Sequence, residues 1–417
     1  MGKSYEEKIA EQIEQYRDNV DMQGLPSIFT IWSHEYIRPG LKSVFGVESI
    51  NLFYVEAFLA AAANNPSPPN FLSLGCGDGG VEIEIARTLV ERGLTKFRFV
   101  CLDLSDPLLS RFRAALPSDL AQHFDIVKGD INSHLFDTKL DAVMANQSLH
   151  HFVDLEGIFR AVHDNLSDRG VFVTSDIIGR NGHMRWPEAR LFVDYFWPFL
   201  TQDQRWNVLL RRAESRFADH DCSTVGFEGI RAQDVLPQIL AQGFQPWKFL
   251  GFGGMVDPFV DRCFGPNLDA DDSNDSFLIR RISLMNDLLL DAGLIKPTMM
   301  MGYFVKHPVE ERYYRTRSAR GAVRDPETDP DWLAEARAIL DESAPEPDFG
   351  FRSPVKLEEA ETEAPSSSTE IEQAQRHLAE ARAVMDHQAR QIEAYQRSTS
   401  WRLTAPLRAA VRLLVRR

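Results

Sequence analysis

The chain has 417 residues, of which 44% are apolar and 10% aromatic, so it can build a large core and is not disordered throughout. At roughly 150 residues per domain, this length predicts two or three structural units. The 46 basic and 61 acidic residues give a formal net charge of −15, which argues against a protein that coats nucleic acid electrostatically.

The first 65 residues show helical periodicity. Apolar side chains recur at spacings of three to four at Ile9, Ile13 and Tyr16. A proline-rich run at 66–69 ends this pattern. We therefore predict an N-terminal helical segment over residues 1–65. No uninterrupted apolar run approaches the roughly 18 residues of a membrane span, so we expect no transmembrane helix.

Residues 66–310 begin by alternating short apolar strands with helices. The first five predicted strands lie at 71–74, 97–102, 124–127, 140–145 and 170–176. Such alternation predicts a parallel sheet that is covered by helices on both faces.

After Ile178 the alternation stops. Two further strands are predicted near 244–252 and 298–306, with a helix at about 277–292 between them. We expect lid-like insertions at about 178–243 and 253–296.

A glycine-rich loop follows the first strand of this sheet. The sequence after Leu74 is Gly75-Cys76-Gly77-Asp78-Gly79-Gly80, and a helix starts near Val81. Glycines let the backbone turn sharply and approach a ligand, while the first N–H groups of the helix face it. The spacing also fits a dinucleotide loop. However, Asp78 would repel a pyrophosphate and attract the amino group of a cationic ligand.

Polar residues end the next three strands as well. The second strand ends at Asp103, where a carboxylate can accept hydrogen bonds from two ribose hydroxyls, and the third ends at Asp130-Ile131. The fourth runs into the sequence NQSLHHF at 146–152. In their order, these four motifs resemble those of class I S-adenosylmethionine-dependent methyltransferases, over about residues 48–306.

The resemblance implies an α/β, Rossmann-like sheet of seven strands in the order 3-2-1-4-5-7-6, with strand 7 antiparallel, over a domain at 66–310. It implies S-adenosylmethionine as cofactor. The methionine part of the cofactor would lie against the glycine loop, and its sulfonium would lie near Asn146. Its ribose would bind Asp103, and its adenine would contact Asp130. The full set of implied cofactor residues is Gly75, Cys76, Gly77, Asp78, Gly79, Asp103, Leu104, Asp130, Ile131, Asn146 and Gln147. A Rossmann-like sheet that has lost its cofactor is the alternative.

Methyl transfer to a hydroxyl requires that the hydroxyl proton leave, so a general base is useful. His150 and His151 follow the fourth strand, next to the expected methyl position, and histidine titrates near neutral pH. We prefer His151 as the base, with His150 and with Asp176, at the end of the fifth strand, as further catalytic candidates. A structural or substrate-positioning role is the alternative for the histidines.

The remaining polar clusters predict no metal site. His183, His220, Asp221 and Glu228 lie in polar stretches of the first insertion, but their spacing matches no ligand motif. We expect a solvated loop or lid there. The four cysteines form no CxxC pair, which favours neither a disulfide framework nor a thiolate zinc site and suits a reducing cytoplasm.

Three segments follow the predicted catalytic domain. Residues 325–369 form an acidic segment that we expect to be a disordered linker with one short helix at 332–340. Residues 370–399 predict a coiled coil, because Ile371, Leu378, Met385 and Ile392 recur every seven residues. Such a coiled coil would join copies of the chain, and a single amphipathic helix is the alternative.

Residues 400–417 predict a basic amphipathic tail of the kind that lies on a membrane surface. The segment at 398–408, STSWRLTAPLR, is similar to a C-terminal segment of bacterial glycosyltransferases and other proteins of cell-surface polysaccharide (O-antigen) assembly. This similarity implies a cytoplasmic protein, peripheral at the inner face of the inner membrane. The alternative is that the tail docks on a protein partner such as a glycosyltransferase.

Together these patterns favour a methyltransferase that O-methylates a sugar during bacterial cell-surface polysaccharide biosynthesis, and no nucleic-acid partner. One alternative is an enzyme that methylates a small metabolite or a lipid intermediate. An alternative of another class is a non-catalytic, membrane-associated scaffold for glycan enzymes.

Overall fold

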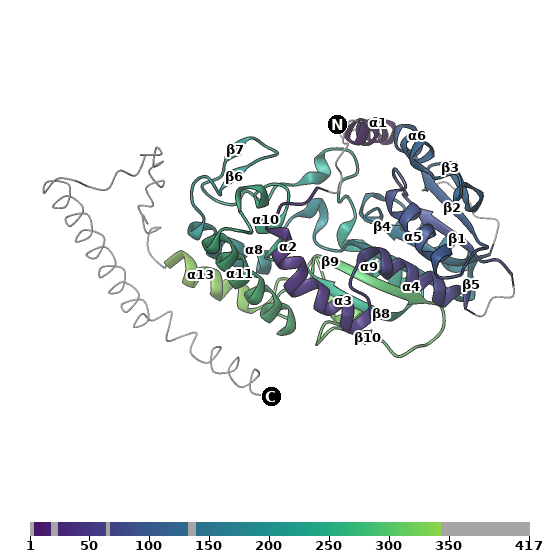
Figure 1. Cartoon of the computed structure of the whole chain (residues 1–417). Helices are drawn as coiled ribbons and strands as arrows, with labels where there is room; N and C mark the ends of the chain where they lie inside the picture. The colour runs from purple at the N-terminus through teal and green to yellow at the C-terminus, as the bar shows by residue number, and fades with distance from the viewer. Residues whose placement is uncertain (1–3, 18–23, 64–66, 132–138, 343–417) are drawn as a thin grey trace, which may run out of the picture. The chain divides into compact units, whose positions relative to one another are not determined.

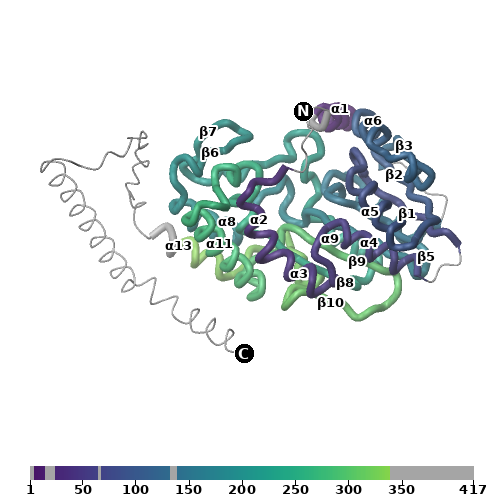
Figure 2. The backbone as a smooth tube through the Cα atoms, viewed as in Figure 1, coloured from purple at the N-terminus to yellow at the C-terminus, as the bar shows by residue number. Residues whose placement is uncertain are grey.

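A computed structural model of the chain describes residues 4–17, 24–63, 67–131 and 139–342 (Figures 1 and 2). These residues all fall within one compact unit. Most of the acidic linker, the predicted coiled coil and the basic tail lie outside the described residues.

The fold is α/β and is centred on a mixed, mostly parallel sheet with the order β10-β8-β9-β5-β4-β1-β2-β3 (Figure 1). The strand bounds are β1 Asn70–Leu74, β2 Arg98–Asp103, β3 Phe124–Lys128, β4 Leu140–Asn146, β5 Leu166–Ile177, β8 Gln245–Phe252, β9 Met299–Val305 and β10 Arg312–Tyr313. β9 is antiparallel to both of its neighbours, β5 and β8. This is the predicted 3-2-1-4-5-7-6 order, because β8 and β9 take the places of strands 6 and 7.

The prediction of seven strands is wrong by one strand. The two residues of β10, Arg312 and Tyr313, pair in parallel with Lys248 and Phe249 at the outer edge of β8. Within the described residues, the sheet therefore has eight strands. So short a strand has no periodicity of its own, and only the return of the chain to this edge creates it.

The sheet buries both faces, as its apolar strands predict. Along β4, Ala142 and Met144 enter one hydrophobic cluster while Val143 and Ala145 enter the other. These alternate positions point to opposite faces of a strand. The first cluster is closed by helices α4 (Ile50–Ala62), α5 (Gly80–Glu91), α6 (Asp106–Ala115) and α11 (Ser273–Asp291). The second is closed by α7 (Leu155–Asn165), α9 (Val235–Ala241) and α12 (Ala319–Ala322).

The N-terminal segment is helical, as predicted. It comprises α1 Tyr5–Arg17, α2 Phe29–Trp32, a π-helical turn Ser33–Ile37, α3 Arg38–Phe45 and α4. By length and composition alone, Phe29–Ala62 could cross a membrane, but half of its apolar window is buried inside the protein. The stretch is also interrupted, since Gly46 ends α3 in a left-handed conformation and Ser49 caps α4. We therefore assign it to the core.

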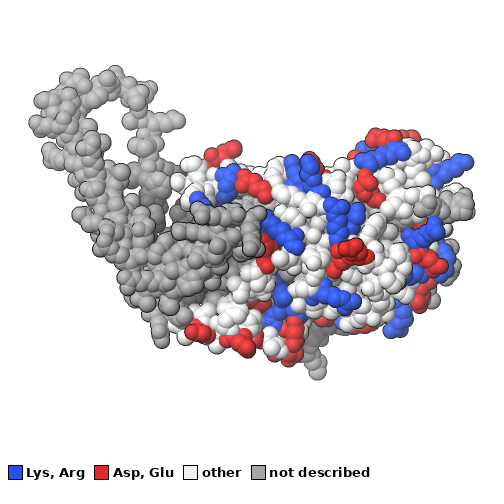
Figure 3. Space-filling model, turned by 90° about the horizontal axis from the view of Figure 1, so that it is seen from below, with Lys and Arg blue, Asp and Glu red and all other residues white. Residues whose placement is uncertain are grey.

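The first insertion, between β5 and β8, is largely irregular. Its short elements are η4 Asn181–His183, α8 Pro187–Phe196, η5 Trp197–Phe199, the hairpin β6 Trp206–Asn207 and β7 Arg212–Ala213, η6 Cys222–Thr224 and η7 Ala232–Asp234, before α9. The second insertion holds α10 Asp257–Val260, η8 Gly265–Asn267 and α11. The short helix expected at 332–340 is present as α13, Trp332–Glu342. On the face shown in Figure 3, acidic and basic side chains are intermingled.

Candidate active site

The loop between β1 and α5 has the backbone that its glycines predict. Gly75, Gly77 and Gly79 all have positive φ angles, of 73°, 57° and 75°. A Cβ at Gly79 would lie 2.3 Å from the ring of Phe112, and one at Gly75 would lie 2.7 Å from the Cβ of Ser148. A Cβ at Gly77 would meet nothing within 4 Å. The outer two glycines are thus required by packing, whereas Gly77 borders open space.

Asp103 ties this loop to the end of β2. Its Oδ2 accepts a hydrogen bond from Gly77 N at 2.9 Å, and its Oδ1 accepts one from Ser105 N at 2.8 Å. Burial raises the pKa of Asp103, and these backbone N–H groups oppose that rise. Each carboxylate oxygen can accept one further hydrogen bond. The side chain is therefore held in place and can still accept from a ligand.

The other predicted cofactor residues lie at the same edge of the sheet. Asp78 Oδ1 accepts from Gly80 N at 3.3 Å at the start of α5. Asn146 Oδ1 accepts from Tyr54 Oη at 3.0 Å. Cys76, Leu104 and Ile131 are buried or half-buried there. Gln147 has a positive φ of 52°, which a non-glycine residue rarely adopts, and its backbone N–H donates to Ser175 O at 2.8 Å.

Helix α1 reaches this edge, although nothing in its sequence predicts that it does. Tyr5 Oη donates to Asp130 Oδ2 at 2.7 Å, and the Tyr5 ring packs on Phe227 with ring centroids 5.4 Å apart. Further along α1, the Gln12 amide joins two other segments. Its Oε1 accepts from Phe227 N at 3.0 Å and its Nε2 lies 3.2 Å from His151 Nδ1. The N-terminal helix thus covers the positions expected for both cofactor and acceptor.

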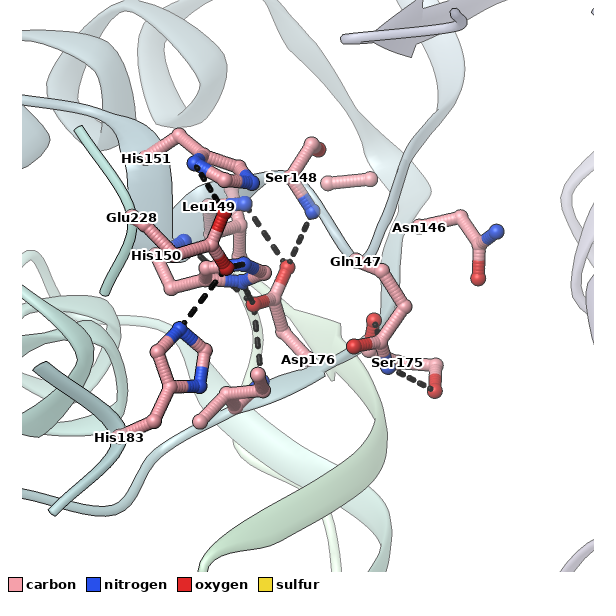
Figure 4. Close-up of polar contacts among 12 residues, drawn as sticks. Asn146, Gln147, Ser148, Leu149, His150, His151, Ser175, Asp176, His183 and Glu228 are labelled. Carbon is pink, nitrogen blue, oxygen red and sulfur yellow. Dashed lines mark hydrogen bonds and ion pairs between the residues drawn. The ribbon is translucent and has the colours of Figure 1, made fainter. Parts of the chain in front are cut away.

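Asp176 organises the turn that follows β4 (Figure 4). Its side chain is fully buried, and Oδ2 accepts from Ser148 N at 2.9 Å and from Leu149 N at 2.8 Å. Its Oδ1 lies 2.6 Å from His150 Nδ1. Burial alone would raise the pKa of Asp176, but His150 and the backbone N–H groups bring it below its ordinary value.

His150 lies between two carboxylates. Its side chain is almost completely buried, with Nδ1 on Asp176 and Nε2 3.6 Å from Glu228 Oε1. Burial lowers the pKa of His150, but the two carboxylates outweigh burial and raise it to about 9. Without another cation nearby, this imidazole therefore carries a proton at neutral pH.

His151 behaves in the opposite way. Burial and the neighbouring His150 lower the pKa of His151 to about 3, so its ring is neutral. The Gln12 Nε2 group can only donate, so His151 Nδ1 is the acceptor of that hydrogen bond. The two adjacent histidines thus have different protonation states and different partners.

The polar stretches around His183 and Glu228, expected to be a solvated loop or lid, bury most of these two side chains. Each side chain is only about one fifth exposed, and His183 Nε2 lies 2.9 Å from Glu228 Oε1. In Figure 4, Glu228 lies among the three imidazoles of His150, His151 and His183. The histidines lower the pKa of Glu228 far below its ordinary value, although burial acts in the other direction.

His220 and Asp221 do not join this cluster. His220 is exposed, and Asp221 Oδ1 accepts from Ser223 N within its own turn. Neighbouring glycines are the sequence feature that distinguishes His183 and Glu228 from His220 and Asp221. Gly182 precedes His183 and Gly229 follows Glu228, and the two glycines meet through a Gly182 N to Gly229 O hydrogen bond of 2.9 Å.

The arrangement of strand-end motifs agrees with a comparison to known families. Residues 72–172 match a methyltransferase domain. The matched residues run from β1 through the glycine loop, Asp103, Asp130 and His150 into β5. The match supports the coarse prediction, a methyltransferase, and agrees with S-adenosylmethionine as the cofactor of such a domain. It does not extend to the tail or to a substrate.

No curated protein matches the chain. Among solved structures, it is similar to an S-adenosylmethionine-dependent methyltransferase from Mesorhizobium loti, with 20% identity, 59% of this chain and 95% of that chain covered, and a TM-score of 0.31. It is also similar to the glycopeptide N-methyltransferase MtfA in complex with sinefungin. The identity is 15%, the match covers 60% of this chain and 87% of that chain, and the TM-score is 0.31.

A third similar structure is that of the plantazolicin methyltransferase BpumL in complex with SAH. The identity is 11%, the match covers 73% of this chain and 97% of that chain, and the TM-score is 0.35. Likenesses this distant say nothing of the acceptor of this chain.

Proposed function

We propose that this chain is an S-adenosylmethionine-dependent methyltransferase that O-methylates a sugar in bacterial cell-surface polysaccharide biosynthesis. The observation that carries the methyltransferase part is the gathering of the glycine loop, Asp103, Asp130 and Asn146 at the carboxyl edge of one sheet, next to buried His150 and Asp176. Open α/β sheets bind ligands at this edge.

The residues at this edge fit the cofactor. The side of Gly77 that a Cβ would occupy is open, so a ligand can approach the backbone there. Asp103 is held by two backbone N–H groups and keeps acceptor capacity for the ribose hydroxyls. When bound, S-adenosylmethionine supplies a methyl group that its sulfonium has already activated. The protein then has to align the acceptor and remove its proton.

His151 is our candidate for the group that takes this proton. Its pKa of about 3 before substrate binds keeps Nδ1 unprotonated, but makes it a weaker base than a free histidine. Its Nδ1 already accepts a hydrogen bond from the Gln12 amide, which is the interaction that an acceptor hydroxyl would make before losing its proton. An acceptor that replaced Gln12 at this nitrogen would lie beside Asp176-bound His150. Asp176 acts through His150 and the turn at 148–150, so we assign it a positioning role.

The saccharide acceptor and the membrane location rest on the sequence of residues 398–417, which lie outside the described residues. We propose that this tail holds the enzyme at the cytoplasmic face of the inner membrane, near glycosyltransferases. Each arginine near an anionic leaflet contributes about 1 kcal/mol of binding. Flotation on anionic liposomes tests this. The full chain should float, and a chain that ends at Glu370 should not, whereas equal recovery would contradict the membrane proposal.

The acceptor is tested by supplying methyl-labelled S-adenosylmethionine together with lipid-linked or nucleotide-linked saccharides. We expect the unchanged chain to transfer label to the saccharide. We expect His151→Ala to lose this transfer while it still binds the cofactor. Label only in small metabolites or lipids would contradict the saccharide proposal. Undiminished turnover by His151→Ala would exclude His151 as the base.

A further inference from the structure

Three donor atoms from separate segments converge next to the proposed acceptor position. They are Nε2 of His150 after β4, Nε2 of His183 in η4, and a carboxylate oxygen of Glu228 in the first insertion. All three lie within 4.8 Å of one another. Glu228 Oε1 is 2.9 Å from His183 Nε2 and 3.6 Å from His150 Nε2. Donors bound to one ion at about 2.0–2.2 Å, with bond angles of about 90–120°, lie about 3–3.6 Å apart.

When His150 is neutral, the lone pair of its Nε2 atom faces the point where the three donor atoms converge. Asp176 already accepts backbone N–H groups, so it is the acceptor toward His150 and the Nδ1 atom carries the proton. A neutral His150 then presents the lone pair of Nε2 to Glu228 Oε1 at 3.6 Å, a distance too long for a good hydrogen bond. A carboxylate on the far nitrogen of an imidazole is the usual second partner of a metal-binding histidine.

His183 shows that the arrangement has a conformational cost. Its φ of 58° is in the left-handed region, which costs a non-glycine residue about 1–3 kcal/mol. Its Nε2 is buried and makes no well-aligned hydrogen bond, although Glu228 Oε1 is close. A Cβ at Gly229 would lie 2.6 Å from the His183 ring. The backbone is therefore shaped to aim this imidazole at Glu228.

The charge of the cluster also favours a cation. Asp176 is fully buried and Glu228 is mostly buried, so two carboxylates share a space poor in water, and a proton on His150 balances the charge of only one of them. The nearest arginine in sequence, Arg185, pairs instead with Asp257 at 3.1 Å. A divalent ion would balance the charge of the two carboxylates.

We propose that His150, His183 and Glu228 bind one divalent transition-metal ion, although their sequence spacing predicts no metal site. Two imidazoles and one carboxylate suit Zn²⁺, Co²⁺, Fe²⁺ or Mn²⁺ rather than Mg²⁺ or Ca²⁺, which prefer oxygen ligands. With only three protein ligands, the ion keeps open positions. Its role rests on the proposed function: it would bind the acceptor hydroxyl and make its proton easier to remove.

The test uses the full chain without a histidine tag, stripped with a chelator and titrated with Co²⁺. We expect visible d–d absorption that saturates at one Co²⁺ per chain. His183→Ala and Glu228→Gln should each weaken Co²⁺ binding at least about 100-fold, and Asp176→Asn about 10–100-fold. His220→Ala is the matched control, because His220 is exposed in the same insertion, and it should bind like the unchanged chain.

Titration of every variant with S-adenosylmethionine checks folding and separates the two proposals. A chain that binds S-adenosylmethionine but has no saturable Co²⁺ absorption overturns the metal site alone. Equal Co²⁺ affinity in His183→Ala and the unchanged chain overturns it as well. A chain that binds Co²⁺ at this site but not S-adenosylmethionine contradicts the proposed function and leaves the metal site standing.

Discussion

Glu82, on the buried side of α5 just after the glycine loop, illustrates how one residue makes stability depend on pH. It is 3% exposed, and its Oε1 accepts a hydrogen bond from Ser73 Oγ at 2.7 Å. Burial, opposed by this hydrogen bond, raises the pKa of Glu82 from 4.5 to about 7. Because its folded pKa is raised, the contribution of Glu82 is complete below about pH 4.5 and is lost as pH rises through about 7.

At pH 8.5 the ionised Glu82 should cost on the order of 3 kcal/mol of unfolding free energy relative to pH 4.5. Glu82→Gln should therefore reduce the loss of stability between pH 5.5 and 8.5, measured by urea denaturation. Glu84→Gln on the exposed side of the same helix is the control and should leave the loss unchanged. The same pH dependence in Glu82→Gln and the unchanged chain would contradict this account.

A comparison of Gly77 with Gly93 distinguishes the effect of backbone strain from an effect on ligand binding. Gly77 and Gly93 both have positive φ angles, of 57° and 93°, and a Cβ at either would meet nothing within 4 Å. Gly77→Ala and Gly93→Ala should each cost about 1–2 kcal/mol of stability. Only Gly77→Ala should also weaken S-adenosylmethionine binding, by an expected tenfold or more in calorimetry. Equal cofactor affinities of the two variants would remove Gly77 from the proposed cofactor site.

Much of the site was predictable at the residue scale because its signals are local. Gly75, Asp103, Asp130 and His150 each lie at the end of a strand or within four residues after it, where sequence alone indicates the sheet edge. His183 and Glu228 are 45 residues apart in an irregular insertion, so no periodicity connects them. Their proximity depends on two glycine turns that meet only in the folded chain.

At the scale of elements, helix ends depend on caps that periodicity does not reveal. The helix expected at 277–292 begins at Ser273, because Asp272 Oδ1 accepts from Asn274 N at 2.8 Å and from Asp275 N at 3.0 Å. Asp272→Ala should lower the unfolding free energy by about 1 kcal/mol, measured by thermal or urea denaturation. The affinity of the Asp272→Ala variant for S-adenosylmethionine should not change. A fully retained stability would show that the cap contributes nothing.

At the scale of the whole molecule, the apolar pattern locates the strands, whereas their order was expected from the resemblance to class I methyltransferases. The sheet has the expected order and an antiparallel β9. The eighth strand was missed because it is two residues long and depends on pairing with β8. The cover of the site by α1 was also missed, since its contacts join Tyr5 to Asp130 and Gln12 to His151 across more than 100 residues of chain.

The central claim, that this sheet edge binds S-adenosylmethionine, is tested most directly by calorimetric titration of the full chain and of Asp103→Ala. We expect micromolar binding at one site per chain and a loss of affinity of about tenfold or more in Asp103→Ala, because the variant loses a charged hydrogen-bond acceptor for the ribose. No binding by the unchanged chain, or equal affinity in Asp103→Ala, would contradict it.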